Sequence, residues 1–374
     1  MPRPLNRRQW LAATGALAAT TLARPLQAAA VQPTGSTPAQ TQPIRLMSNE
    51  NPLGPSEAAR AAMQDAFDLG CRYHFEAHET LRALIAEAEG VTPDHVFLGA
   101  GSHEILRMAG TAYGLDGGEV VVGDPTYERM ARYAEAAGAR IHRVPLTPDT
   151  FALDLDAMDR RTTNGVRLVF VCNPNNPTGT LVDADAVEDF CRSVARRAVV
   201  FVDEAYHEYV DDPAYRSMVP LVRDGHNVII SRTFSKIHGL AGLRVGYGLA
   251  RPDIAQRVTA FITGGGVNVL GAHAALAAYR DTDFVTASRQ QNAEARQFLY
   301  RTFDELGYRY LRSHTNFVFM HLGRPVQGFR AEMERQGVLV GRPFPPMTDW
   351  CRVSLSTMDD LQVFASALRV MSSP

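Results

Sequence analysis

Lysine is nearly absent from this 374-residue chain. The sequence has 38 lysine and arginine residues, and Lys236 is the only lysine among them. An arginine stays charged in proteins, whereas a lysine amine can lose its proton and act as a nucleophile. A lysine kept in an arginine-dominated chain therefore favours a role for its amine. The formal net charge of −2 argues against a nucleic-acid-binding surface, so no nucleic-acid partner is expected.

Cysteine is also scarce. The four cysteines are far apart in the sequence, with neither metal-ligand spacing nor the density of a disulfide framework. No metal site is predicted. We expect the cysteines to be small, partly buried apolar side chains, and the sequence leaves open whether any of them pair. They are Cys71, Cys172, Cys191 and Cys351.

The N-terminal apolar run is too short to cross a bilayer as a permanent helix. This run, Leu11–Leu22, follows paired arginines at positions 7 and 8 and precedes three alanines at 28–30 that form a small-residue cleavage site. The order resembles a twin-arginine export signal over residues 1–30. The expected location is periplasmic, without membrane attachment after cleavage, or cytoplasmic if the signal is not used. The alternative is an amphipathic N-terminal helix.

The remaining length suits one large and one smaller domain, and 45% hydrophobic with 21% charged residues is ordinary for a soluble protein. Residues 31–43 are rich in Pro, Thr, Gln and Ser, which predicts a flexible linker. Residues 44–56 form a polar, proline-punctuated N-terminal arm that ends at a helix cap. We expect this arm to lie across another surface of the protein.

Strand-like and helix-like segments alternate from residue 57 onward. This alternation predicts an α/β fold, with a mainly parallel sheet covered on both faces in a large domain over 57–283. A smaller α+β domain is predicted over 284–374. Ligands of such sheets bind at the carboxyl ends of the strands. The predicted strands of the large domain are Val96–Leu98, Glu119–Val122, Arg140–Val144, Arg167–Cys172, Val199–Asp203, Asn227–Ser231 and Arg244–Leu249.

Lys236 lies in a segment with an unusual combination of side chains, from Thr233 to Gly248. Hydroxyl groups precede the lysine, and Arg244 follows it across a glycine-rich loop. This set suits a cofactor with an aldehyde and a phosphate. Lys236 would form a Schiff base with the aldehyde, and Thr233, Ser235 and Arg244 would hold the phosphate. The alternative is a surface lysine in a loop with turn-forming glycines.

Three polar side chains follow the next predicted strand ends. A turn with two prolines and a glycine presents Asn176 as a fixed hydrogen-bond donor, and the bond to Pro177 suits a cis peptide. An acid at the end of a buried strand, Asp203, is costly unless a protonated ring nitrogen pairs it. Tyr206 can donate to a phenolic oxygen of the cofactor. The alternatives are an Asn-rich turn without function and a helix-capping acid.

Two other strand ends add an anion site and an aromatic ring. Ser102 opens a helix whose free N–H groups would bind a phosphate, and His103 lies in its first turn. Tyr127, which follows the second strand, would stack flat on an aromatic cofactor. The alternatives are an ordinary serine N-cap and a tyrosine packed in the core.

With these motifs, the sequence resembles the fold-type I pyridoxal-phosphate-dependent aminotransferases (class I/II), in the histidinol-phosphate aminotransferase-like group. The resemblance covers about Leu46 to Met371. It implies a seven-stranded, mainly parallel sheet, pyridoxal 5′-phosphate as cofactor, and transfer of an amino group between a small amino donor and a 2-oxo acid such as 2-oxoglutarate. Its carriers are SNENPLGPS, AGSHEIL, PTYERM, CNPNNPTGT, VDEAYHEY, TFSKIHGLAGLRVGYG and CRVSLST.

The resemblance also implies the roles of individual residues. Lys236 is the base that moves the substrate's proton, Asp203 pairs the ring nitrogen, and Tyr206 is the third catalytic residue. Asn176 and Tyr206 bind the ring oxygen, and Tyr127 stacks. The phosphate is held by Ser102, His103, Thr233, Ser235 and Arg244.

Four further residues concern the partner subunit and the substrate. Tyr73 matches a tyrosine that reaches the phosphate of the neighbouring subunit, which implies a homodimer. Arg352 matches the arginine that grips the acidic group of the substrate. Arg342 is a candidate second cation, with a solvated loop charge as the alternative, and Asn51 in the arm is a further candidate substrate-binding residue.

Two segments depart from the family pattern. His74 stands where the family usually has proline, and Ile262–Leu270 lacks the usual proline-aromatic run before Asn268. Both departures concern the substrate rather than the cofactor. Histidinol phosphate is the first candidate donor and aromatic amino acids come next.

Two other functions compete with transamination. The first is a decarboxylase of the phosphothreonine type, which would use the same cofactor site. The second is a non-catalytic, cofactor-binding sensor domain. A sensor of this kind normally has an attached DNA-binding module, and no basic helix-turn-helix stretch precedes the domain.

Overall fold

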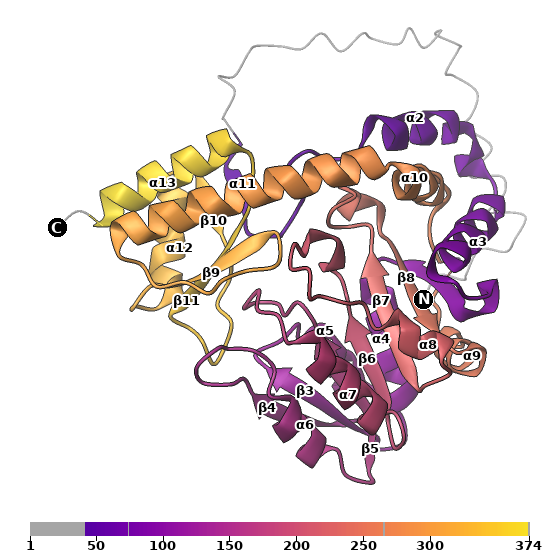
Figure 1. Ribbon diagram of the computed structural model, residues 1–374. Helices are drawn as coiled ribbons and strands as arrows, with labels where there is room; N and C mark the ends of the chain where they lie inside the picture. The colour runs from indigo at the N-terminus through magenta and orange to yellow at the C-terminus, as the bar shows by residue number, and fades with distance from the viewer. Residues whose placement is uncertain (1–41, 74, 265, 373–374) are drawn as a thin grey trace, which may run out of the picture. The chain divides into compact units, whose positions relative to one another are not determined.

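The computed structural model describes residues 42–73, 75–264 and 266–372 (Figure 1). The predicted export signal, nearly all of the predicted linker, His74 and Gly265 lie outside the described residues. Residues 43–374 form one compact unit. The predicted boundary between a large and a small domain at 283/284 therefore stays a prediction.

A seven-stranded sheet lies at the centre of this unit, with the strand order β2-β8-β7-β6-β5-β3-β4. The five strands β3, β4, β5, β6 and β7 are all parallel to one another. Strand β8 runs antiparallel to both of its neighbours, β2 and β7. The expectation of a seven-stranded, mainly parallel sheet is confirmed. The strands are β2 (Val96–Ala100), β3 (Glu119–Asp124), β4 (Arg140–Pro145), β5 (Val166–Cys172), β6 (Val199–Asp203), β7 (Val228–Thr233) and β8 (Val245–Ala250).

Helices cover both faces of the sheet, as Figure 1 shows. Along β5, Val169 and Val171 belong to one apolar cluster, and Leu168 and Phe170 to the other. Because both faces are buried, the strands are almost continuously apolar. The first cluster includes residues of α3 (Glu76–Glu89), α6 (Leu155–Arg161), α7 (Ala184–Val194), α8 (Val219–Arg223) and α10 (Val269–Arg280), and the second includes residues of α4 (Ser102–Gly114), α5 (Arg129–Ala136) and α9 (Pro252–Thr259).

The C-terminal part contains a separate apolar cluster between helices and two short sheets. Strand β11 (Trp350–Ser354) pairs antiparallel with β9 (Phe317–His321), and β10 (Val338–Val340) pairs parallel with β1 (Ile44–Leu46). The N-terminal arm thus adds a strand here, which agrees with its expected position across another surface. The helices are α11 (Thr282–Leu306), α12 (Val326–Arg335) and α13 (Met358–Ser372), and α2 (Glu57–Asp65) follows the arm.

The sequence from Tyr308 to Met320 has a strand-like apolar pattern, but β9 begins only at Phe317. Ser313 donates through Oγ to the carbonyl oxygen of Phe317, and the hydroxyl of Thr315 donates to the same oxygen at 3.2 Å. These side chains satisfy the backbone locally and hold a turn in place of an extended ladder. Tyr310 keeps one isolated bridge to Met320.

All four cysteines are free, with Cys71 exposed and the other three buried. The expectation of small buried apolar side chains therefore holds for three of them.

None of the helices described in the structure is long and apolar enough to cross a membrane. Within the same residues, no group of three histidine, cysteine, aspartate or glutamate side chains could hold a metal ion.

Candidate active site

A cavity of about 600 Å³ lies where β5, β6 and β7 end. This volume is within the range of small-molecule sites, and the carboxyl ends of parallel strands are where such sheets bind ligands. The structure brings eleven of the predicted site residues together around it. They are Ser102, His103, Tyr127, Asn176, Asp203, Tyr206, Thr233, Ser235, Lys236, Arg244 and Arg352.

Three predicted site residues do not line this cavity. The Tyr73 side chain is 95% exposed. Arg342 forms an ion pair with Glu128 at 2.6 Å, outside the cavity. Asn51 is buried and donates to the carbonyl oxygen of Ile237 at 2.7 Å, which fastens the arm to the loop that carries Lys236. Their predicted roles toward cofactor and substrate stay predictions.

Lys236 lies in the turn that follows β7, with its amine in the cavity. The Nζ atom donates to the backbone oxygens of Asn49 at 3.0 Å and Ser48 at 3.4 Å, so the arm closes over it. Burial, together with the charge of Arg352, lowers the pKa of the amine to about 7. A large fraction of this amine is therefore uncharged and nucleophilic near neutral pH.

The reactivity of Lys236 in the cofactor-free protein is expected to titrate with a midpoint near pH 7. Because Lys236 is the only lysine, an acylating reagent followed by peptide mass spectrometry reads this one side chain. The same titration in denaturant should return the midpoint to the ordinary value of about 10.5. A native midpoint close to the denatured one would show that the cavity does not lower the pKa of the amine.

Asp203 is the last residue of β6 and is only 2% exposed. Its Oδ1 atom is buried and has no hydrogen-bond partner among the described residues. Burial raises the pKa of this carboxyl to about 7. A buried carboxylate with one oxygen unpartnered, at a cavity wall, suits a cationic group in the cavity, such as a protonated ring nitrogen.

The hydroxyl of Tyr206 accepts two hydrogen bonds from amides, one from Nδ2 of Asn49 at 3.0 Å and one from Nδ2 of Asn176 at 3.1 Å. Burial raises the pKa of the phenol, so it keeps its proton. Because both amides donate to the oxygen, the phenolic hydrogen remains available to a guest in the cavity. The peptide bond between Asn176 and Pro177 is cis, as the sequence suggested.

The start of α4 and Arg244, which directly precedes β8, together form a candidate anion site. The N-terminus of α4, at Ser102, offers free backbone N–H groups. Arg244 donates to Oγ of Ser235 at 3.1 Å and lies against Gly101, where an added Cβ would be 2.1 Å from its guanidinium. Arg244 also has a left-handed backbone with φ 56°, a conformation that side chains rarely adopt. The close contact of Arg244 with Gly101 and the left-handed backbone of Arg244 place its guanidinium beside the N-terminus of α4.

His103 and Tyr127 lie side by side in the cavity wall, with 3.1 Å between Nε2 of the histidine and the phenolic oxygen. Burial first, and then the charges of Arg129, Arg244 and Lys236, lower the pKa of His103 to about 4. This histidine is therefore neutral at physiological pH and adds no charge to the anion site. Stacking of Tyr127 on a cofactor ring stays a prediction.

Arg352, on β11, reaches the cavity from the C-terminal part of the chain and is 9% exposed. It donates to Oδ1 of Asn176 at 2.7 Å and to the backbone oxygen of Met47 at 2.8 Å. Its Nε atom has no partner among the described residues. The rings of Phe317 and Phe344 flank the guanidinium at 5.4 and 4.9 Å. A buried arginine with an open donor is suited to an incoming acidic group.

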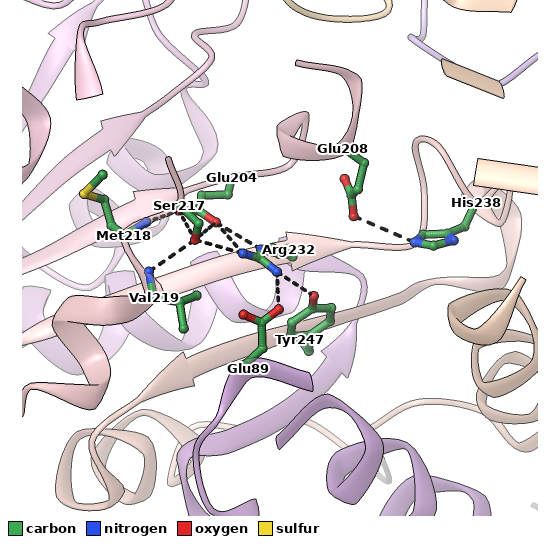
Figure 2. A network of polar contacts seen from close by, with 9 residues as sticks. All are labelled: Glu89, Glu204, Glu208, Ser217, Met218, Val219, Arg232, His238 and Tyr247. Carbon is green, nitrogen blue, oxygen red and sulfur yellow. Dashed lines mark hydrogen bonds and ion pairs between the residues drawn. The ribbon is translucent and has the colours of Figure 1, made fainter. Parts of the chain in front are cut away.

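A buried polar network centred on Arg232 lies next to the cavity residues in the sequence, and Figure 2 shows its contacts. Glu204 follows Asp203, Arg232 precedes Thr233, and successive strand residues point to opposite faces. Glu204 accepts from Nε of Arg232 at 3.0 Å, and Arg232 also pairs with Glu89 at 2.5 Å. The network ties β6, β7 and α3 together and thereby fixes the spacing of Asp203 and Thr233. Its other members include Ser217, Met218 and Tyr247.

Several cavity residues were missing from the sequence-based set. Ser48, Asn49 and Glu50 of the arm line the cavity, and Asn49 has φ 54°. Arg129, two residues after Tyr127, lines it as well. The arm motif SNEN contained the first three, but nothing local in the sequence shows which arm side chains face Lys236.

The comparisons with known proteins agree with this geometry. The family model for aminotransferase class I and II matches residues 41–368. The chain belongs to this family. The histidinol-phosphate aminotransferase of Moorella thermoacetica is 41% identical over 87% of this chain and 84% of its own length.

Two solved structures have the same fold. The first is the crystal structure of a protein from Erwinia carotovora atroseptica that is described as a putative histidinol-phosphate aminotransferase. It has a TM-score of 0.85 and 37% sequence identity, and the match covers 88% of this chain and 96% of that one. The histidinol-phosphate aminotransferase of Sinorhizobium meliloti, solved with pyridoxal-5′-phosphate, has a TM-score of 0.82 and 28% identity, over 88% and 91%. Both are called aminotransferases, as the resemblance implied.

This aminotransferase uses pyridoxal 5′-phosphate as cofactor, and its cavity fits that group. The unpartnered Oδ1 of Asp203 would face the ring nitrogen, and the hydroxyl of Tyr206 would face the ring oxygen. The helix N-terminus at Ser102 and the cation of Arg244 would hold the phosphate. The expectation of a pyridoxal-phosphate-dependent transaminase is confirmed, in preference to a decarboxylase or a sensor domain.

Proposed function

We propose that this aminotransferase takes its amino group from a small donor with a phosphate or carboxylate, with histidinol phosphate as the first candidate and aromatic amino acids as the next. The position of Arg352 carries the proposal. It is the one buried guanidinium in the cavity whose Nε lacks a partner among the described residues. The relatives named histidinol-phosphate aminotransferase, at 31–41% identity over most of the chain, support the choice of first candidate.

Each predicted catalytic residue has a distinct task in this proposal. Pyridoxal phosphate, when bound, supplies an electron sink for the electrons of the substrate's broken bond. Lys236, a large fraction of which is uncharged near pH 7, takes the proton from the α-carbon of the donor. Asp203 keeps the ring nitrogen protonated, and Tyr206 donates to the ring oxygen. Asn176 orients both Tyr206 and Arg352, since its amide contacts each of them.

Replacing Arg352 by alanine is expected to lower kcat/KM for every donor by about 10- to 100-fold, the effect of losing a charge-assisted hydrogen bond. The measurement is a donor screen at fixed 2-oxoglutarate, with histidinol phosphate, histidinol and aromatic amino acids. Replacing Arg335, which lies on the surface of α12, by alanine provides a control for the loss of an arginine. A screen in which the wild type uses none of these donors would reject the proposed donor class.

We also propose a homodimer in which each active site borrows Tyr73 from the other subunit. Tyr73 is 95% exposed, and the neighbouring Phe67 and Phe75 are 71% and 54% exposed. Large aromatic side chains grouped on a surface mark an interface between proteins. Because Tyr73 does not reach the cavity of its own chain, a second copy is a natural recipient.

Mixing Tyr73→Phe subunits with Lys236→Ala subunits is expected to restore part of the activity that Lys236→Ala lacks. Hybrid dimers would contain one site with both an intact Lys236 and an intact Tyr73. The control is each variant mixed with itself, at the same total concentration, with the mass in solution measured by light scattering. A fully active monomer would contradict the composite site.

We further propose that the protein is exported by the twin-arginine route. The arginines at 7 and 8, the apolar run and the alanines at 28–30 support it, and the family model begins only at residue 41. This route carries folded proteins, so cofactor could be acquired before export. Replacing both arginines by lysine should retain the protein in the cytoplasm in a fractionation experiment. Finding wild-type protein in the cytoplasm with residues 1–30 intact would reject export.

Export bears on the choice of donor. Intermediates of histidine biosynthesis are cytoplasmic, so an exported enzyme would have a weaker case for that pathway. Aromatic amino acids, which also carry a carboxylate for Arg352, then gain weight as donors. Fractionation and the donor screen together separate these two cases.

A further inference from the structure

One cationic side chain of the active-site cavity, that of Arg129, has no hydrogen-bond or ion-pair partner among the residues that the structure describes. Four cationic side chains line the cavity: Arg129, Lys236, Arg244 and Arg352. In the proposed function, Lys236 and Arg244 serve the cofactor, and Arg352 binds one acidic group of the substrate. Across residues 42–73, 75–264 and 266–372, the side chain of Arg129 makes neither a hydrogen bond nor an ion pair. Its guanidinium is therefore open to a ligand.

The local structure does not account for a cation at this position. Arg129 is the first residue of α5. The N-terminus of a helix carries partial positive charge, so an arginine there is electrostatically unfavourable. The adjacent Glu128 does not compensate it, because Glu128 pairs with Arg132 at 2.9 Å and with Arg342 at 2.6 Å. Neither helix stability nor an ion pair explains Arg129.

The carboxylates of the cavity are also engaged elsewhere. Glu50 pairs with Arg45 at 3.0 Å, and Asp203 faces the position of the ring nitrogen. The charge of Arg129 nevertheless acts inside the cavity, since it is the largest of the charges that lower the pKa of His103. An anion brought by the substrate would therefore meet an unneutralised positive charge at this wall.

We propose that Arg129 binds the second anionic group of the substrate, the one that Arg352 does not hold. This inference rests on the proposed function and narrows its substrate class to molecules with an anionic group at the far end. Such a group is the phosphate of a phosphorylated amine, or the distal carboxylate of a dicarboxylic 2-oxo acid. Arg342, the other candidate for this task, is bound to Glu128 and lies outside the cavity.

The test uses two pairs of substrates that differ in the far anionic group. Histidinol phosphate is compared with histidinol as donor, and 2-oxoglutarate with 2-oxobutyrate as acceptor. Replacing Arg129 by glutamine should lower kcat/KM for the anionic member of at least one pair by about tenfold, and for its neutral counterpart by less than about threefold. Replacing it by lysine should restore part of the difference. In a Lys236→Ala background, which removes turnover, calorimetry should show the same difference in Kd.

Two matched variants accompany Arg129→Gln. Arg132→Gln removes a neighbouring arginine of the same helix that pairs with Glu128, and discrimination within the pairs should not change. Arg342→Gln tests the competing candidate. If Arg342→Gln removes the discrimination and Arg129→Gln leaves it intact, the inference is wrong.

The outcomes also separate this inference from the proposed donor. A wild type that rejects histidinol phosphate but prefers 2-oxoglutarate, with the preference lost in Arg129→Gln, supports Arg129 and rejects the donor. A wild type that prefers histidinol phosphate, with the preference kept in Arg129→Gln, supports the donor and overturns the inference. Equal losses on both members of each pair, or a wild type that discriminates in neither pair, also overturn the role of Arg129.

Discussion

Replacing Lys236 by alanine is expected to reduce transamination by on the order of 10⁴-fold or more, since it removes both a nucleophile and a general base. Its amine is the only side-chain amine of the chain, so no neighbouring lysine can substitute for it. We expect the cavity otherwise to stay intact, because among the described residues the hydrogen bonds of Nζ go to the backbone oxygens of Ser48 and Asn49, and Nζ also lies over the Tyr206 ring. The variant should therefore keep the cofactor without a covalent bond.

The measurement combines kinetics with mass spectrometry. Borohydride reduction of the yellow wild type should attach the cofactor to the peptide that contains Lys236, and the same treatment of Lys236→Ala should leave the protein mass unchanged. Replacing Lys236 by arginine keeps a cation without a usable amine, so it separates charge from chemistry. Added small primary amines should restore part of the proton transfer to the alanine variant. Attachment of the cofactor to any other residue would refute the role of Lys236.

The central sheet could be predicted from the sequence because each of its strands is marked by a local run of apolar residues. Strands buried on both faces are continuous apolar runs, and all seven predicted runs are strands of the sheet. Asp203 ends one of these runs and Asn176 follows another within a few residues, and parallel strand ends converge on one edge. Their common location in the cavity follows from this topology.

Features that depend on pairing between distant segments could not be predicted. The arm forms a strand with β10, and register with a partner 294 positions away leaves no local pattern. Arg342 looks free in the sequence, yet Glu128, 214 positions away, binds it. Arg129 is an exposed residue at the start of a helix, and nothing in the sequence near it shows that it also lines the cavity.

Asp203 and its neighbour Glu204 are adjacent buried acids with opposite surroundings. Glu204 is neutralised by Arg232 and accepts from Ser217 and Met218, whereas Oδ1 of Asp203 has no partner among the described residues. Altering a buried carboxylate that is paired with a cation lowers the stability of the folded protein. A buried carboxylate without such a partner itself lowers that stability, because its burial carries a desolvation cost. Replacing each acid by its amide should therefore change the stability of the cofactor-free protein in opposite directions.

The direction of the stability change for Asp203→Asn follows from the pKa of Asp203, which burial raises from 3.8 to about 7. A carboxyl whose pKa is raised on folding destabilises the folded state progressively as pH rises from about 4 to about 7, and fully above that range. Asp203→Asn should consequently stabilise the cofactor-free protein above pH 7 by up to about 4 kcal/mol, the free-energy equivalent of the whole shift. The gain should shrink as pH falls toward 4.

The same substitution should damage the loaded enzyme, because an amide cannot hold the ring nitrogen in its protonated form. We expect kcat to fall on the order of 10²-fold or more, as for other losses of a preorganised charge at a reacting group. Thermal unfolding of cofactor-free Asp203→Asn and Glu204→Gln at pH 6 and pH 8, with kcat of the loaded forms, provides the measurement. Asp203→Asn should unfold at a higher temperature than wild type at pH 8, and Glu204→Gln at a lower one at both pH values. If Asp203→Asn destabilised the cofactor-free protein at pH 8 as Glu204→Gln does, then the charge of the Asp203 carboxylate would already be compensated within the protein and would not be reserved for the cofactor.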